Sequence, residues 1–187
     1  MGKITFITGG ARSGKSYHAE LIAKRFSDVA YVATGIDTDT EMKLRIARHK
    51  QQRPNEWSTY EAPYDIVGVV RKNTHEVYLI DCITVYITNL ILKEKQDWDA
   101  EVLTFEEQQQ LEGFVDKSIT ELIDEMKKNK ADFIVVSNEV GMGLVPAYAL
   151  GRIFRDAAGR ANRMLAEAAD TAYLSVSGIL MPLKQEV

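Results

Sequence analysis

Short runs of β-branched and aromatic residues alternate along the chain with longer segments of helical periodicity. Continuous apolar runs of five or six residues, bounded by turn residues, are typical of strands buried on both faces of a sheet. Five segments have this character, and we expect a buried strand at each of Lys3–Thr8, Val29–Thr34, Val77–Asp81, Phe133–Ser137 and Thr171–Val176.

The segments between these runs repeat apolar residues at three- and four-residue spacing, which predicts amphipathic helices. We expect helices, the third of them with Asp65 as its N-cap, at Lys15–Phe26, Glu41–Gln52, Asp65–Lys72, Thr84–Lys95, Phe105–Asn129 and Ala147–Ala169. Buried strands that alternate with helices favour an α/β fold, in which a mostly parallel sheet is covered on both sides. The last segment, Leu174–Leu183, has Ser177-Gly178 at its centre and predicts a hairpin that adds an antiparallel edge.

Composition excludes several classes of protein. No repeat, low-complexity tract or Pro/Gly-rich linker divides the 187 residues, so we expect a single domain over residues 1–187. The 23 basic and 27 acidic residues give a net charge of −4, which argues against nucleic-acid or anionic-membrane binding through net charge. Cys82 is the only cysteine, so an intrachain disulfide and a cysteine-based zinc cage are excluded. The N-terminal segment lacks a secretory core, and we expect a cytoplasmic protein.

One motif carries specific chemistry. It fits the pattern G-x-x-x-x-G-K-[ST] and reads Gly9-Gly10-Ala11-Arg12-Ser13-Gly14-Lys15-Ser16. The alternative is a glycine-rich turn with an exposed lysine, but the motif follows an apolar strand and opens a helix, as a phosphate-binding loop does. In that interpretation Lys15 reaches the β- and γ-phosphates of a nucleotide, and the Ser16 hydroxyl binds Mg²⁺.

A second acidic or metal-binding position is expected at the end of another buried strand. Asp81 ends the run Val77–Asp81 and is the candidate partner of Mg²⁺, either directly or through a neighbouring ligand. The alternative role for Asp81 is that of a helix cap.

The sequence Asn129-Lys130-Ala131-Asp132 matches the guanine-reading motif of GTPases, but it precedes its strand instead of following it. We therefore interpret it as the end of a long helix.

Basic residues are concentrated between positions 43 and 53, in a chain whose net charge is negative. Arg45, His49 and Arg53 are spaced at i, i+4 and i+8, so they share one face of the predicted helix. Guanidinium groups would bind phosphate oxygens and favour the neutral imidazole, which makes His49 a candidate nucleophile toward phosphorus. From composition alone, a solvated basic helix is the alternative. His18 and His75 lack such surroundings.

A glycine-containing loop and an arginine-rich helix follow the fourth predicted strand. The loop runs through Asn138-Glu139-Val140-Gly141-Met142-Gly143, and the helix carries Arg152, Arg155, Arg160 and Arg163 together with Gly151 and Gly159. Glycine inside a helix costs about 1 kcal/mol relative to alanine. These glycines suggest close approach by a ligand or by another helix, and packing is the commoner explanation for either glycine alone.

Four segments together resemble the bifunctional adenosylcobinamide kinase/adenosylcobinamide-phosphate guanylyltransferase (CobU/CobP) family. They are the phosphate-loop motif, Arg45-Ile46-Ala47-Arg48-His49-Lys50 with Arg53-Pro54, the loop from Asn138 to Gly143, and Phe154-Arg155-Asp156-Ala157-Ala158-Gly159-Arg160. The resemblance extends from Ile4 to about Ile179. It implies phosphorylation of adenosylcobinamide by ATP or GTP. It also implies transfer of GMP from GTP to adenosylcobinamide phosphate, through a guanylylated histidine that corresponds here to His49.

The same resemblance implies a RecA-like fold and a homotrimer with active sites at subunit interfaces. Beyond the phosphate loop, it implies nucleotide contacts from Ala33, Thr34, Gly35, Lys50, Gln51, Gln52, Arg53, Glu61 and Asp81. Two other functions stay open. One is a small P-loop kinase of another alcohol, in which His49 is merely solvated. The other is a nucleotide-driven switch, against which the missing guanine-reading order argues.

Overall fold

The computed structural model describes residues 2–37, 40, 43–44, 50, 53–94 and 103–185. Seven strands and five helices are assigned among these residues. In chain order they are β1 (Ile4–Gly9), α1 (Lys15–Ala23), β2 (Val29–Ala33), β3 (Ser58–Glu61), α3 (Ile66–Lys72), β4 (Val77–Asp81), α4 (Ile83–Glu94), α5 (Phe105–Lys128), β5 (Asp132–Val136), α6 (Ala149–Ala168), β6 (Thr171–Val176) and β7 (Ile179–Lys184).

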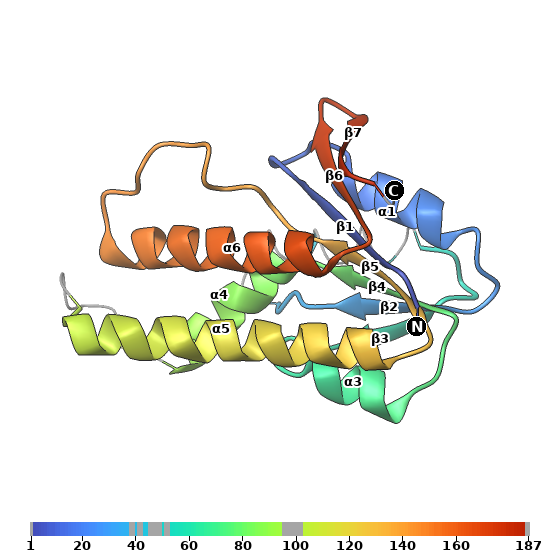
Figure 1. Ribbon diagram of the computed structural model, residues 1–187, viewed down its shortest axis with the longest axis horizontal. Coiled ribbons are helices and arrows are strands. Elements are labelled where there is room, and N and C mark those ends of the chain that lie inside the picture. The colour runs from blue at the N-terminus through green and yellow to red at the C-terminus, as the bar shows by residue number, and fades with distance from the viewer. Residues whose placement is uncertain are drawn as a thin grey trace.

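All seven strands form one sheet in the order β3-β2-β4-β5-β1-β6-β7. The first six strands of this order pair in parallel, and only β7 pairs antiparallel, with β6. Helix α1 lies on one side of the sheet, and α3, α4, α5 and α6 lie on the other (Figure 1). The prediction of a mostly parallel sheet that is covered on both sides and extended by a C-terminal hairpin is confirmed.

Each central strand is buried on both faces because its side chains alternate between two apolar clusters. In β4, for example, Tyr78 and Ile80 belong to the cluster under α3–α6, whereas Val77 and Leu79 belong to the cluster under α1. Tyr78 stacks on Phe133 of the neighbouring strand, with ring centroids 5.3 Å apart. This two-sided burial explains why the strands read as continuous apolar runs in the sequence.

Apart from the expected helix Glu41–Gln52, the expected elements are found within a few residues of their predicted bounds. Asp65 caps α3 as predicted, since its Oδ1 atom accepts a hydrogen bond of 2.7 Å from the Gly68 amide. The guanine-motif look-alike is confirmed as the end of α5, because Asn129 is its C-cap and Asp132 opens β5. Strand β3 was missed, and the expected helix Glu41–Gln52 lies almost wholly outside the described residues.

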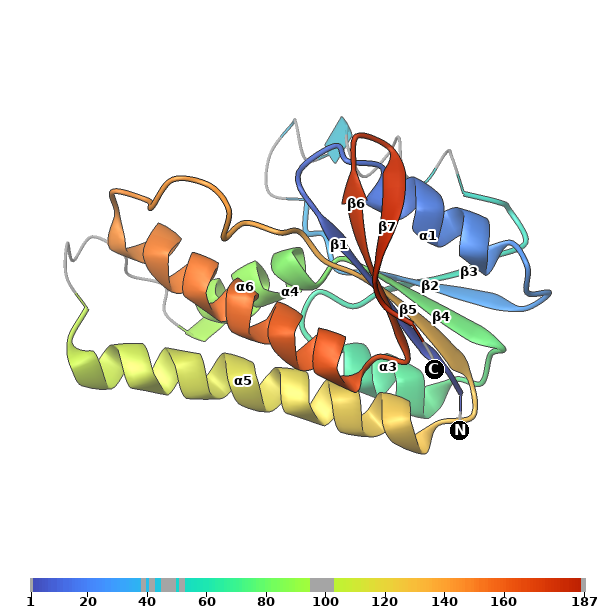
Figure 2. The same ribbon diagram turned by 45° about the horizontal axis from the view of Figure 1, so that its top comes forward.

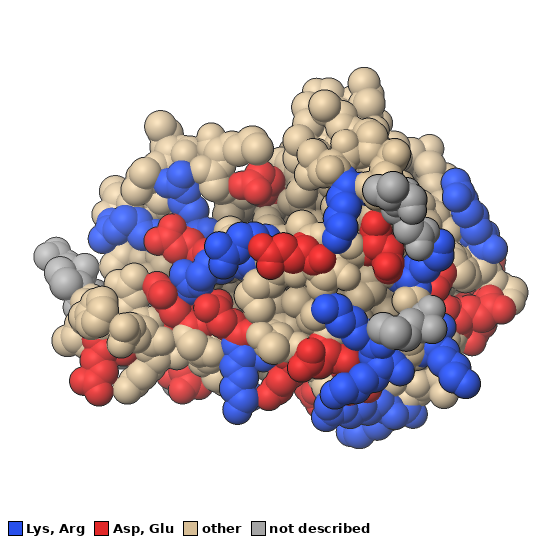
Figure 3. Space-filling model, viewed as in Figure 1, with Lys and Arg blue, Asp and Glu red and all other residues tan. Residues whose placement is uncertain are grey.

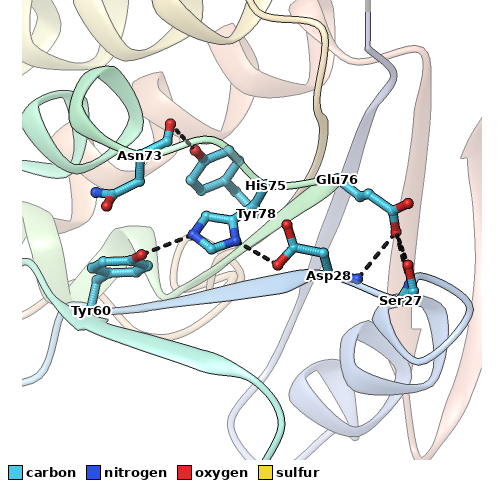
Figure 4. A network of polar contacts seen from close by, with 7 residues as sticks. All are labelled: Ser27, Asp28, Tyr60, Asn73, His75, Glu76 and Tyr78. Atoms are coloured by element: carbon cyan, nitrogen blue, oxygen red, sulfur yellow. Dashed lines mark hydrogen bonds and ion pairs between the residues drawn. The ribbon is translucent and has the colours of Figure 1, made fainter.

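A polar network ties β3 to the amino-terminal ends of β2 and β4 (Figure 4). His75 Nδ1 lies 2.7 Å from Asp28 Oδ1, and His75 Nε2 lies 2.8 Å from the Tyr60 hydroxyl. The carboxylate of Glu76 accepts hydrogen bonds from the backbone and hydroxyl of Ser27. His75 therefore joins three strands at the edge of the sheet where the parallel strands begin.

The long helices α5 and α6 lie side by side over the sheet and extend beyond it (Figures 1 and 2). Acidic and basic side chains are interspersed on the face viewed in Figure 3. The electrostatic potentials of interspersed charges of opposite sign largely cancel at distances beyond a Debye length. Among the described helices, none has the length and apolar character needed to cross a membrane.

The packing makes a testable prediction about stability. Phe133→Ala removes a fully buried ring from the central sheet and should lower the free energy of unfolding by about 3–5 kcal/mol. Phe105→Ala makes the same chemical change at a side chain that is 77% exposed, and its effect should stay within about 0.5 kcal/mol. Urea denaturation of both variants measures the difference; equal losses would contradict the described core.

Candidate active site

The phosphate-loop motif joins the carboxyl end of β1 to the first residue of α1, as the sequence predicted. Strand β1 lies between β5 and β6 in the sheet. The next strand in the chain, β2, lies on the far side of β5 and β4, so the strand order reverses beside β1. In parallel sheets of this kind, ligands bind outside the carboxyl ends of the strands where the strand order reverses. The motif therefore lies at the edge of the sheet that favours a ligand.

Two glycines of the motif occupy positions that other residues would not tolerate. Gly14 has a φ of 97°, a conformation that L side chains rarely adopt. At Gly9 a Cβ atom would lie 2.3 Å from the backbone oxygen of Ser175. The loop can therefore follow this path only with glycine at both ends.

The N-terminus of α1 is open to an anion. Gly14 is its N-cap residue, and no side chain that the structure describes forms a capping hydrogen bond there. The first amide groups of a helix have no partner within the helix, and the helix dipole favours negative charge beside them. A phosphate group fits this end of α1 for both reasons.

Lys15 supplies a positive charge at the same place. Its side chain is only 7% exposed, and Nζ donates a hydrogen bond of 2.6 Å to the Gly10 carbonyl. Burial lowers the pKa of Lys15, whereas negative charge at Cys82 and Asp81 raises it. Since burial raises the pKa of the Cys82 thiol to about 11, this thiol is neutral near pH 7, and Asp81 is the partner that matters.

Asp81 ends β4, two strands away from β1. Its Oδ2 atom accepts a hydrogen bond of 2.7 Å from the hydroxyl of Tyr31, a side chain that is almost fully buried. Burial and the Asp81 charge raise the pKa of Tyr31 well above its usual value, so the phenol stays protonated and continues to donate. The guanidinium carbon of Arg53 lies 3.4 Å from the centre of the Tyr31 ring.

Mg²⁺ fits the chemistry of this edge. Ser16 and Asp81 supply hard oxygen atoms, the ligand type that Mg²⁺ prefers. The described residues contain no cluster of three or more His, Cys, Asp or Glu side chains that would hold a metal alone. Mg²⁺ commonly uses one or two protein ligands together with substrate phosphates, so two protein oxygens are sufficient.

A hydrogen-bonded chain connects the ends of β2, β4 and β5. Thr34 Oγ1 accepts a 2.9 Å hydrogen bond from the Cys82 amide, and Asn89 Nδ2 donates to the Thr34 carbonyl at 2.7 Å. Asn138, directly beyond β5, donates from Nδ2 to Thr84 Oγ1 at 2.7 Å. These contacts fix the strand ends relative to one another.

The structure places several of the other predicted nucleotide-binding residues. Ala33, Thr34 and Gly35 lie at the carboxyl end of β2, beside Glu61 at the end of β3. Lys50 Nζ lies 2.6 Å from Glu61 Oε1, and this contact lowers the pKa of Glu61. The predicted residues His49, Gln51 and Gln52 lie outside the described residues.

Several arginines of α6 have structural contacts. Arg155 donates to the Gly141 carbonyl at 2.6 Å, and Arg152 donates to the Ala147 carbonyl at 2.6 Å, so both hold the preceding loop. Arg160 pairs with Glu112 and Asp116 of α5. Close approach explains Gly151, where a Cβ atom would lie 2.7 Å from Pro146 Cβ, but at Gly159 no atom lies within 4 Å of that position.

Sequence reasoning missed the residues that support the site from behind. Tyr31 holds Asp81, and Ser175 and Gly178 contact the phosphate loop. His18, which lacked distinguishing surroundings in the sequence, contacts Gly178. Tyr31 lies in an ordinary apolar strand and Ser175 in a hairpin strand, so no motif marks either. A hollow of about 560 Å³ beside His75 and Glu76 lies at the opposite edge of the sheet and contains none of these groups.

The sheet and its loop define the class of the protein. Strand β5 lies between β1, which carries the phosphate loop, and β4, which ends in Asp81, so the chain is a P-loop nucleotide-binding protein of RecA-like type. Residues 5–183 match the model of the family described as "Cobinamide kinase / cobinamide phosphate guanyltransferase". The chain belongs to this family.

Curated relatives agree with this assignment. The chain is 40% identical to the bifunctional adenosylcobalamin biosynthesis protein CobU of Escherichia coli over 185 residues, which cover 95% of this chain and 98% of that protein. It is 37% identical to the bifunctional adenosylcobalamin biosynthesis protein CobP of Pseudomonas aeruginosa over 183 residues, which cover 96% of each. The resemblance inferred from four sequence segments is confirmed.

Solved structures of low sequence identity share the fold. One is a protein of Pyrococcus horikoshii, with a TM-score of 0.53, 7% identity, and coverage of 98% of this chain and 86% of that chain. Another is a prototypical ATPase from the type III secretion system of pathogenic bacteria, with a TM-score of 0.52 and 12% identity. That match covers 93% of this chain and 51% of the ATPase. At these identities the likeness concerns the fold alone.

Proposed function

We propose that the protein phosphorylates the hydroxyl group of adenosylcobinamide with ATP or GTP and then transfers GMP from GTP to the resulting phosphate. The products of the second reaction are adenosylcobinamide-GDP and pyrophosphate. The observation that carries this proposal is the buried Lys15 in an open phosphate loop, within a chain that matches the family over residues 5–183.

The kinase reaction needs little covalent chemistry from the protein. In our proposal, the amide groups at the start of α1 bind the β- and γ-phosphates, and Lys15 neutralises the charge that develops on them. Ser16 and Asp81 would hold Mg²⁺, which would offset the negative charge of the phosphate groups. Tyr31 orients the Asp81 carboxylate through its hydrogen bond.

The guanylyl transfer needs a nucleophile, and we assign this role to His49. A ring nitrogen of the neutral imidazole forms a bond to the α-phosphorus of GTP as pyrophosphate leaves. An oxygen of adenosylcobinamide phosphate then attacks the same phosphorus, and the bond to His49 breaks. Support comes from the next residue, because Lys50 is paired with Glu61 at the carboxyl end of β3, the same edge of the sheet as the phosphate loop.

Two further properties belong to this proposal. A homotrimer with active sites between subunits follows from the family resemblance, and a cytoplasmic location follows from the sequence. Both stay predictions. Gel filtration with light scattering measures the first directly.

The proposed function is tested by the products that the wild-type protein forms with cobinamide, Mg²⁺ and GTP. We expect cobinamide phosphate first and then a corrinoid that carries label from α-labelled GTP, with release of pyrophosphate. Formation of cobinamide phosphate alone would reduce the protein to a kinase. Turnover of GTP with no modified corrinoid would instead favour a nucleotide-driven switch.

His49→Asn should separate the two reactions. Wild-type protein incubated with α-labelled GTP should retain a label that acid removes and base does not, because a phosphorus–imidazole bond is acid-labile. The variant should lose this label and about 10²–10⁴-fold of guanylyl transfer, yet keep most of the kinase activity. His75→Gln is the control, since His75 lies at the opposite edge of the sheet. Acid-labile labelling of His49→Asn at the wild-type rate would place the nucleophile elsewhere.

Asp81→Asn should raise the Mg²⁺ concentration that gives half-maximal activity, because the amide is a neutral and weaker ligand. High Mg²⁺ should restore part of the rate. Asp132→Asn changes an aspartate at the amino-terminal end of the neighbouring strand and should leave the Mg²⁺ dependence unchanged. An unchanged dependence in Asp81→Asn as well would return Asp81 to the role of a helix cap.

A further inference from the structure

The turn between β6 and β7 lies against the back of the phosphate loop. The carbonyl oxygen of Ser13 accepts two hydrogen bonds from this hairpin, one of 2.7 Å from Ser175 Oγ and one of 2.9 Å from the Gly178 amide. Figure 2 shows the hairpin beside β1 and the start of α1. Ser175 is fully buried and Ser13 is 7% exposed, so water does not compete freely for these bonds.

The two bonds fix the orientation of one peptide group. In a trans peptide, the carbonyl oxygen and the following amide hydrogen point in opposite directions. Because the Ser13 oxygen points to the hairpin, the Gly14 amide hydrogen points away from it. Gly14 is the N-cap of α1, where the phosphate loop presents its amide groups.

A third contact closes this unit. His18 Nε2 lies 2.8 Å from the Gly178 carbonyl oxygen, and a carbonyl can only accept, so Nε2 carries the hydrogen. The His18 amide in turn donates to the Gly14 carbonyl at 3.0 Å. The hairpin turn is tight: Ser177 and Gly178 both have positive φ, at 50° and 82°. The loop, the first turn of α1 and the hairpin are therefore linked in a closed ring of contacts.

We infer that Ser175 is a positioning residue for nucleotide phosphates, which acts by holding the Ser13–Gly14 peptide in the orientation that binds an anion. Its hydroxyl does not touch the nucleotide. The inference rests on the proposed function, since it takes a nucleoside triphosphate as the ligand of the loop. It assigns a role in nucleotide binding to the C-terminal hairpin, which lies on the far side of β1 from Asp81.

The hydroxyl can be tested apart from the shape of the side chain. Ser175→Thr and Ser175→Val have the same shape, so any crowding by the added atoms is common to both, and only Thr retains the donor. Ser175→Ala removes the donor without adding volume. The matched control is Thr171→Val, which removes the hydrogen bond from Thr171 Oγ1 to Thr5 Oγ1 at the other end of the same strand pair.

Calorimetric titration of each variant with GTP and with ATP, together with Tm, measures the effect. We expect Ser175→Ala and Ser175→Val to bind both nucleotides about threefold to tenfold more weakly, as for the loss of one buried hydrogen bond. We expect Ser175→Thr to bind both nucleotides more tightly than Ser175→Val by the same factor, because only Thr retains the hydroxyl donor. Thr171→Val should lower Tm without changing the affinity.

Two outcomes separate the inference from the proposed function. Equal nucleotide affinity for wild type, Ser175→Ala and Ser175→Val, or an equal loss in Ser175→Thr and Ser175→Val, would overturn the positioning role while leaving the proposed function intact. A wild-type protein that binds neither GTP nor ATP would overturn the proposed function itself. It would also remove the ligand on which the inference rests.

Discussion

The constraint on which the site depends is the need to hold the phosphate loop in a shape that leaves backbone amide groups at the start of α1 available to a ligand. Such a turn is costly, because a polar group without a partner raises the free energy of the folded chain when water is restricted around it. The chain meets this cost by fixing the turn from outside. Strand β1 is paired on both sides, the Glu139 amide donates to the Gly9 carbonyl at 2.9 Å, and the hairpin holds Ser13. The amide groups of α1 are thereby kept ready for a phosphate.

The order of the strands then determines which groups lie at the edge of the sheet where we propose that the nucleotide binds. The carboxyl ends of parallel strands lie at one edge of the sheet, so β1 contributes the loop, β4 contributes Asp81, and β3 contributes Glu61 with its partner Lys50. The negative charge of Asp81 raises the pKa of Lys15, and charges of both signs at this edge suit a triphosphate with its metal ion. One nucleotide site at this edge can serve a phosphoryl transfer and a guanylyl transfer.

Much of this arrangement could be predicted from the sequence, because it depends on local patterns. Strands that are buried on both faces are apolar along their whole length. The glycines, Lys15 and Ser16 form a motif in which each residue has a physical role in binding a phosphate or its metal ion. Strand β3 escaped prediction because it is short, lies at an edge and alternates between half-buried and exposed residues. Tyr31 and Ser175 escaped because their roles depend on contacts 50 and 162 residues away along the chain. Arg155 and Arg160 of α6 hold a loop and a neighbouring helix, and no local motif in the sequence indicates these contacts.

The central claim is that one phosphate loop serves both reactions, and Lys15→Ala tests it most directly. Kinase activity and guanylyl transfer should be assayed separately, the second with cobinamide phosphate supplied, and compared with Lys24→Ala, which changes an exposed lysine at the end of the same helix. The account predicts that Lys15→Ala lowers both rates by about 100-fold or more and that Lys24→Ala changes neither. Guanylyl transfer at the wild-type rate in Lys15→Ala would contradict a shared site.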